Sequence, residues 1–499
     1  MRSFALGLMA LLMGSAAFAA DLRIGLQDDA DTLDPDQSRT FVGRIVYAGL
    51  CDKLVDITPD LEIVPMLATG WEWSEGGKVL TMTLRDGVKF HDGAAFDAAA
   101  AVYNLERSRT LPESRRKSEV ASIESVEATG PMTIKITLKQ PDATFLSQLT
   151  DRAGMMVSPA AAEAAGADFG LAPVCSGPFK FRERVQQDRI VLERFADYWN
   201  ADAIHFDTVT YLPIPDTTVR LANLRAGDLD MIERLAATDL GSASSDASLK
   251  VEKITSLGYQ GMTVNIANGD QRHPQFSADP RLRQALELSI DRDAINQVVF
   301  EGAFTPGNQP WPPSSPWYDS RHPVPARDVE KAKALMAEAG VERVALKIQT
   351  ANNPVQMQLT QVIQAMAAEA GFDIEIVAKE FATLLQDQTA GAYEVSQIGW
   401  SGRTDPDGNI HTFVTTGGGI NDSKYSNPEV DRLLNEARTA SDMAGRKAAY
   451  DAANEILRVE LPIIYLYHPA WLWAMDADLE GFVAYPDGMI RLQGMKLAN

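Results

Sequence analysis

The stretch that decides the fold runs from residue 344 to residue 378 and reads VALKIQTANNPVQMQLTQVIQAMAAEAGFDIEIVA. We predict a strand over 344–350, a helix over 354–370 that ends at Gly371, and a second strand over 373–378. This β-α-β alternation is typical of two parallel strands in one sheet. The second half of the chain is therefore predicted to fold as an α/β lobe around a largely parallel sheet.

Outside this stretch, the pattern predicts further strands and more than one lobe. Residues 79–84 and 133–138 alternate apolar and polar side chains, as strands with one buried face do. Residues 463–467 read as a buried strand, and the character of the sequence changes near residue 259. The chain has 499 residues, several times the roughly 100–150 residues of a usual domain. We expect at least two lobes.

The composition excludes several classes of protein. Lys and Arg number 46 and Asp and Glu number 68, which gives a net charge of −22. Nucleic-acid binding needs a basic surface, and anionic membranes repel an acidic protein. With 45% hydrophobic and 23% charged residues, the chain has the composition of a globular protein. We expect no nucleic-acid partner.

Residues 1–19, MRSFALGLMALLMGSAAFA, have the order of a secretory signal peptide. Arg2 precedes a short apolar run, and Ala17 and Ala19 form an A-x-A cleavage site. A membrane anchor is the alternative, but roughly ten apolar residues are too few to cross a bilayer. No cysteine follows the cleavage site for a lipid anchor, so we expect the mature protein in the periplasm.

The sequence has two cysteines, Cys51 and Cys175. In an exported protein an even pair favours a disulfide, although two buried thiols that never meet would give the same sequence.

The usual catalytic and metal-binding motifs are absent from the sequence. The six histidines are widely separated, and no HExxH, G-x-S-x-G, P-loop or G-x-G-x-x-G pattern occurs. The acidic stretches at 28–36 and 405–407 lack the calcium-loop pattern. We predict a binding protein with no catalytic residues, no metal ligands and no cofactor.

Four segments carry a resemblance to a known family. They are LRDGVKFHDG at 84–93, PVCSGPFKF at 173–181, PRLRQALELSIDR at 280–292 and SNPEVDRLL at 426–434. In this order and spacing the chain resembles the dipeptide and oligopeptide class of periplasmic substrate-binding proteins of ABC importers, solute-binding family 5. The family has glycine where this chain has Cys175, which fits a disulfide confined to a subgroup.

The resemblance implies two α/β lobes with mixed sheets, joined by two crossing strands near 261–265 and 468–473. The first lobe would comprise residues 20–262 and 472–499, and the second lobe residues 263–471. A peptide or another small zwitterionic or carboxylate-bearing solute would bind between the lobes. The expected partners are this solute and an inner-membrane ABC permease, with the binding protein a monomer.

In this family a W-x-x-D segment places a carboxylate against the ammonium group of the ligand. Here the fourth position is Arg403, which cannot hold an ammonium but binds oxyanions well. Three interpretations are open: Asp405 or Asp407 takes over the ammonium, the ligand presents its anionic end to Arg403, or Arg403 pairs internally with one of these aspartates. The resemblance implies a binding segment made of Trp400, Ser401, Gly402, Arg403, Asp405 and Asp407.

The first lobe is expected to contribute Asp31 and Thr32, from the loop that corresponds to the family's T-L-D-P stretch. A purely structural turn at Asp34-Pro35 is the alternative. His91 lies in a family signature and is assigned no ligand.

Two other functions stay open. Relatives of the family bind nickel or haem, and His411 near the predicted cleft loop could supply one ligand. A secreted hydrolase is the second alternative. Within the family, dipeptides, glutathione-like peptides, opines and other small zwitterions fit the sequence equally well.

Overall fold

The parallel strand pair predicted at 344–378 is confirmed in the computed structural model, which describes residues 20–440 and 442–498. Strands β15 (Val344–Ala351) and β16 (Phe372–Lys379) pair in parallel, and helix α11 (Pro354–Ala368) connects them. The Asn353 side chain caps α11 by accepting a hydrogen bond from the Gln356 amide, and Pro354 occupies the first turn. The predicted signal peptide, 1–19, lies outside the described residues.

The second lobe is built on a six-stranded mixed sheet. Its spatial order is β14 (Thr305–Pro306), β18 (Ile463–His468), β13 (Tyr259–Val264), β17 (Val395–Trp400), β15 and β16. The helices that pack around it are α7 (Pro274–Ala278), α8 (Pro280–Ser289), α9 (Arg292–Phe300), α10 (Val329–Glu338), α11, α12 (Phe381–Ala390), α13 (His411–Val414), α14 (Pro428–Thr439) and α15 (Met443–Glu460). Strand β13 runs antiparallel to both neighbours, so the sheet is only partly parallel.

The first lobe contains a seven-stranded mixed sheet. Its order is β12 (Leu249–Thr255), β19 (Ala470–Asp476), β11 (Met231–Ile232), β1 (Asp21–Leu26), β10 (Thr208–Pro213), β9 (Arg189–Arg194) and β8 (Phe179–Val185). The helices of this lobe are α1 (Phe41–Leu50), α2 (Ala98–Thr110), α3 (Phe145–Gln148), α4 (Pro159–Ala165), α5 (Thr217–Ala226) and α6 (Leu240–Ser244).

A separate antiparallel sheet forms a second layer within the first lobe. Its order is β4 (Ala68–Ser74), β5 (Val79–Leu84), β7 (Thr133–Leu138) and β6 (Ile123–Gly130). This antiparallel sheet has a hydrophobic core of its own. The core contains Leu80, Met82 and Leu84 of β5, as the alternation of apolar and polar residues predicts. Two short strand pairs complete the lobe, β2 (Val55–Ile57) with β3 (Ile63–Pro65) and β20 (Leu479–Glu480) with β21 (Lys496–Leu497).

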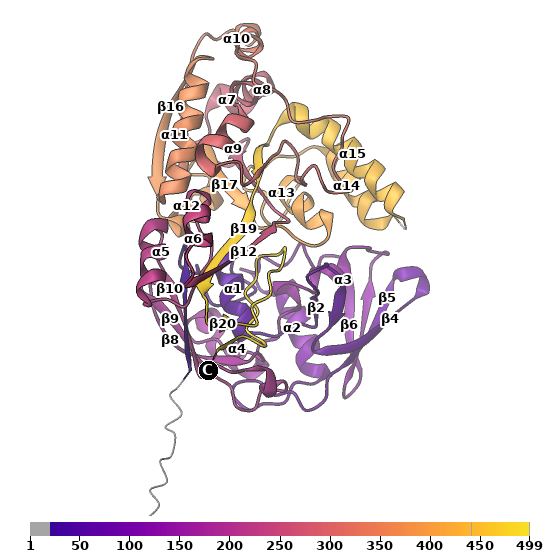
Figure 1. Cartoon of the computed structure of the whole chain (residues 1–499). Helices are drawn as coiled ribbons and strands as arrows, with labels where there is room; N and C mark the ends of the chain where they lie inside the picture. Colours follow the sequence, from indigo (N-terminus) through magenta and orange to yellow (C-terminus); the bar gives the residue numbers. More distant parts are fainter. Residues whose placement is uncertain (1–19, 441, 499) are drawn as a thin grey trace, which may run out of the picture.

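The described chain passes between the two large sheets twice, at 256–258 and at Pro469. In Figure 1 the second lobe lies above the first, and β12 and the yellow β19 run side by side where the lobes meet. The Ser256 amide donates to the Pro469 carbonyl (3.1 Å), and His468 Nδ1 lies 2.8 Å from the Gly258 carbonyl oxygen. The boundaries expected after residues 262 and 471 therefore fall inside β13 and β19. The predicted lobe boundaries differ from the links in the structure because the short segment 256–258 has no sequence pattern that marks it.

Cys51 and Cys175 form a disulfide in the structure, with their Cα atoms 4.9 Å apart. Cys51 follows α1, and Cys175 lies in the 173–181 segment, beside His91. His91 Nδ1 accepts a hydrogen bond from the Cys175 amide, and Nε2 lies 3.0 Å from the Gly177 carbonyl oxygen. This histidine therefore connects two of the signature segments.

We predict that the disulfide contributes strongly to stability because it closes a loop with a sequence separation of 124 residues. On the chain-entropy relation, a loop of this size stabilises the folded state by about 4–5 kcal/mol. Denaturant unfolding of the C51S/C175S double variant should show this loss in the free energy of unfolding. Coincident unfolding curves for the variant and the native protein would contradict the prediction.

Candidate ligand-binding site

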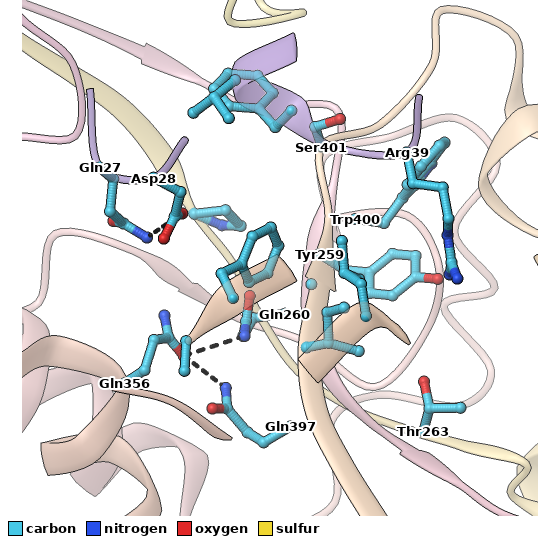
Figure 2. Close-up of a pocket in the computed structure, with 18 of the residues that line it drawn as sticks. Gln27, Asp28, Arg39, Tyr259, Gln260, Thr263, Gln356, Gln397, Trp400 and Ser401 are labelled. Carbon is cyan, nitrogen blue, oxygen red and sulfur yellow. Dashed lines mark hydrogen bonds between the residues drawn. The ribbon is translucent and has the colours of Figure 1, made fainter. Parts of the chain in front are cut away.

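A cavity lies between the two lobes and is lined from both of them (Figure 2). The first lobe contributes Gln27, Asp28, Arg39, Phe41, Arg234 and Trp471. The second lobe contributes Tyr259, Gln260, Gln356, Gln397, Trp400 and Ser401. Because its walls belong to separate sheets, the shape of the cavity depends on how the lobes close.

Three glutamines form a hydrogen-bonded group on the second-lobe wall. Gln356 Oε1 accepts from Gln260 Nε2 (3.2 Å) and from Gln397 Nε2 (2.7 Å), as the dashed lines in Figure 2 show. Gly399, opposite Gln260 on β17, leaves the room for this group, since a Cβ there would lie 2.1 Å from Gln260 Oε1. Such amides can exchange hydrogen bonds with the peptide groups or hydroxyls of a ligand.

The first-lobe wall combines opposite charges with an aromatic pair. The Phe41 and Trp471 rings stack with their centroids 4.4 Å apart, and the Arg234 guanidinium lies 5.0 and 5.2 Å from them. Asp28 accepts a hydrogen bond from Gln27 Nε2 (3.2 Å). Burial raises the pKa of Asp28 to about 6, against the effect of nearby Arg234, which lowers it. Asp28 begins the acidic stretch at 28–36 and was expected, with the residues up to Thr32, to line part of the cleft, whereas no sequence pattern indicated Arg234.

Trp400 and Ser401, predicted as site residues, both line the cavity. Trp400 is the last residue of β17, and its Nε1 donates to Asn409 Oδ1 (3.0 Å). Ser401 Oγ accepts from Arg44 of the first lobe (3.0 Å). The ring of Trp400 is therefore fixed by its own lobe, whereas Ser401 also contacts the other lobe.

Asp405 and Asp407 form ion pairs within the second lobe and do not line the cavity. Asp405 pairs with Arg446 (2.7 Å), and Asp407 forms a two-pronged pair with Arg438 (2.9 and 2.7 Å). Both carboxylates are therefore neutralised by arginines of their own lobe, outside the cavity lining. The structure therefore gives neither aspartate the role expected from the W-x-x-D comparison.

Arg403 pairs across the lobe interface with Asp151 rather than with either of these aspartates. Its Nε lies 2.7 Å from Asp151 Oδ2, and Arg44 Nη2 lies 2.9 Å from the same carboxylate oxygen. Burial alone would raise the pKa of Asp151, but Arg403 and Arg44 hold it well below its usual value. The guanidinium of Arg403 also lies over the Trp400 ring, 4.1 Å from the centroid. Gly402 packs against the crossing segment, where a Cβ would lie 2.3 Å from the Leu257 carbonyl carbon.

Asp31 and Thr32 stabilise their own loop and do not line the cavity. Asp31 accepts hydrogen bonds from Ser38 Oγ (2.8 Å), the Arg39 amide (2.7 Å) and Thr40 Oγ1 (2.9 Å). Thr32 Oγ1 accepts from the Asp34 amide (3.3 Å). These bonds fix the segment before α1, and with it Arg39 and Phe41 of the cavity wall.

His411, the candidate metal ligand, is buried away from the cavity. Its Nε2 lies 3.2 Å from Asn435 Oδ1, and its Nδ1 lies 3.4 Å from Thr415 Oγ1. In the described part of the chain, the residues placed closely enough to share a metal ion are Asp319, His322 and Glu455, also outside the cavity. Asp319 already pairs with Arg321 there (2.6 Å).

The family model for bacterial extracellular solute-binding proteins, family 5 (middle region), matches residues 62–421. The chain belongs to this family. The resemblance drawn from the four sequence segments is therefore confirmed, and with it the two-lobed α/β fold. As a family 5 protein, it is a solute-binding component of an ABC importer. In the described residues, we find no helix with the length and apolar character needed to span a membrane.

Relatives of this family 5 protein match it over nearly their whole length. The glutathione-binding protein GsiB of Pectobacterium atrosepticum is 28% identical, over 99% of this chain and 98% of the relative. The glutathione-binding protein GsiB of Escherichia coli (strain K12) is 29% identical, over 97% of this chain and 96% of the relative.

Solved structures also resemble it closely. The periplasmic binding protein DppA from Helicobacter pylori, in complex with the peptide STSA, is 25% identical with a TM-score of 0.89, over 97% of this chain and 99% of that one. The binding protein AgaA from A. tumefaciens R10, in complex with agropinic acid, is 25% identical with a TM-score of 0.87. The match covers 96% of this chain and 99% of that one.

We predict that replacing Arg403 by Gln shifts the ligand-free protein toward an open form. The change removes an interlobe ion pair, while Asp151 keeps Arg44 as a partner. Loss of this buried ion pair removes Coulombic attraction between the lobes. Small-angle X-ray scattering should therefore show a larger radius of gyration for R403Q.

Arg432→Gln is the matched control, because Arg432 is an exposed arginine of the same lobe whose ion pairs within residues 20–440 and 442–498 are with Glu429 and Glu436 on its own helix. Equal scattering profiles for R403Q, R432Q and the native protein would show that the Arg403–Asp151 pair does not hold the lobes together.

Proposed function

We propose that this protein captures a peptide or another small zwitterionic solute in the interlobe cavity and delivers it unchanged to an inner-membrane ABC permease. The observation that carries the proposal is the cavity itself, whose walls come from both lobes and combine charges, amides and aromatic rings. The names of the relatives support this class of solute, since they include glutathione-binding proteins, a peptide complex and an agropinic acid complex.

Binding is coupled to closure because the solute contacts both lobes only when they are together. A solute that binds the closed form better shifts the open–closed equilibrium toward it. A shift from about 1% to about 99% closed requires about 5.5 kcal/mol of differential affinity. Interlobe contacts such as Arg403–Asp151 and Arg39–Asp422 (2.6 Å) supply part of the closing free energy in addition to the contacts made by the solute.

The remaining parts of the proposal follow from the sequence. Residues 1–19 direct export and are cleaved after Ala19, and the mature protein acts in the periplasm as a monomer. The net charge of the full chain, −22, argues against nucleic-acid partners. Trp400 and Ser401 contact the solute directly, whereas Arg403 positions Trp400 and links the lobes.

Native mass spectrometry of the purified protein tests the proposal, together with titrations using dipeptides, a tetrapeptide, reduced glutathione and an opine. We expect one solute per chain, recovered with its mass unchanged after release. A solute that is cleaved on incubation would favour the hydrolase instead, and the absence of binding to every solute would refute the proposal.

We further predict that Trp400 reports binding through its fluorescence. Because Trp400 lines the cavity, Trp400→Phe should lose much of the solute-induced change in tryptophan emission. Trp73→Phe is the control, since Trp73 is exposed on β4, outside the cavity. An unchanged emission response in W400F would place the bound solute away from Trp400.

A further inference from the structure

Two opposite charges reach the cavity from neighbouring strands of the first-lobe sheet. Asp28 follows β1 and Arg234 follows β11, and these strands pair in parallel through Ile24–Met231 and Gly25–Ile232. Parallel strands end at the same edge of a sheet, where α/β proteins commonly bind ligands. Their ends are fixed to each other, because the Gln27 amide donates to Glu233 Oε1 (2.7 Å).

The carboxylate of Asp28 has no ion-pair partner among the described residues. Its hydrogen bond comes from the neutral amide of Gln27, and Figure 2 shows both side chains at the cavity. The charged groups that act on it are Arg234, Glu233 and Arg220. The Arg220 guanidinium donates hydrogen bonds to backbone carbonyls, including that of Arg234 (2.9 Å). An acid in this setting can accept a cationic group from a ligand.

Arg234 is held in a constrained position with its guanidinium beside the aromatic pair. Its backbone has a φ of 51°, which a residue with a large side chain rarely adopts and which is found preferentially at functional sites. Its Nε forms an ion pair with Glu233 Oε2 (3.3 Å) without a hydrogen bond, and the side chain stays 32% exposed at the cavity. The Arg234 guanidinium can therefore bind an oxyanion that enters the cavity.

We infer that the solute docks on the first lobe through a free α-amino-acid group, with its ammonium on Asp28 and its carboxylate on Arg234. The inference rests on the proposed function and narrows its solute class. Asp28 and Arg234 are not paired with each other, so a group carrying both charges on one carbon can bind between them. The rest of the solute then faces Gln260, Gln356 and Gln397, whose amides suit a peptide bond.

This assignment distinguishes two isomeric probes. In γ-Glu-Leu the ammonium and a carboxylate share one carbon, whereas in α-Glu-Leu that carboxylate is consumed in the peptide bond. The two dipeptides have the same mass, net charge and composition. Isothermal titration at pH 7 should give γ-Glu-Leu at least about tenfold higher affinity, the value of one charge-assisted contact.

Variants then locate the preference within the cavity. Arg234→Gln should weaken γ-Glu-Leu binding by about tenfold or more and leave α-Glu-Leu nearly unaffected, whereas Asp28→Asn should weaken both isomers because each carries a free ammonium. Asp60→Asn is the matched control, because it removes the same charge at an exposed position outside the cavity. Thermal unfolding of each variant checks that the fold is retained.

The pH dependence supplies a second readout. A bound ammonium favours ionised Asp28, so binding weakens as the pH falls through the pKa of about 6. Between pH 7 and pH 5 the affinity for γ-Glu-Leu should fall about tenfold in the native protein, and this fall should disappear in D28N.

The outcomes separate the inference from the proposed function. Equal affinities for the two isomers, or native affinity in D28N, would overturn the inference while solute binding stands. Binding of other solutes in the panel but of neither isomer would do the same. A failure of every solute to bind would overturn both.

Discussion

Lobe closure depends on one covalent constraint: the described chain joins its two large sheets only through residues 256–258 and Pro469. These links lie side by side and are hydrogen-bonded to each other, so they can act as a hinge. Gly258 is required there because a Cβ would lie 1.8 Å from the Trp400 carbonyl oxygen. Everything else between the lobes is non-covalent, so closure can respond to a solute.

The interface around this hinge separates closing from recognition. Arg403 pairs with Asp151 of the opposite lobe and does not line the cavity. Recognition of charge then falls to the first lobe, at Asp28 and Arg234, and recognition of neutral polar groups to the glutamines of the second lobe.

The sequence predicted local structure well and side-chain partners poorly. The β-α-β unit at 344–378 and the strand at 79–84 follow from periodicity and capping, which are local properties. The partners of Arg403, Asp405 and Asp407 are Asp151, Arg446 and Arg438, which lie 31 or more residues away in sequence. No spacing rule predicts such pairs. In the first-lobe loop, Asp31 accepts hydrogen bonds from Ser38 Oγ, the Arg39 amide and Thr40 Oγ1, whereas Asp28 lines the cavity.

The central claim, that a solute binds between the lobes and closes them, is tested most directly by hydrogen–deuterium exchange with and without a bound solute. The account predicts simultaneous protection of the segment after β1 and of the end of β17, one in each lobe. Protection confined to a single lobe, or to the outer surface, would contradict it.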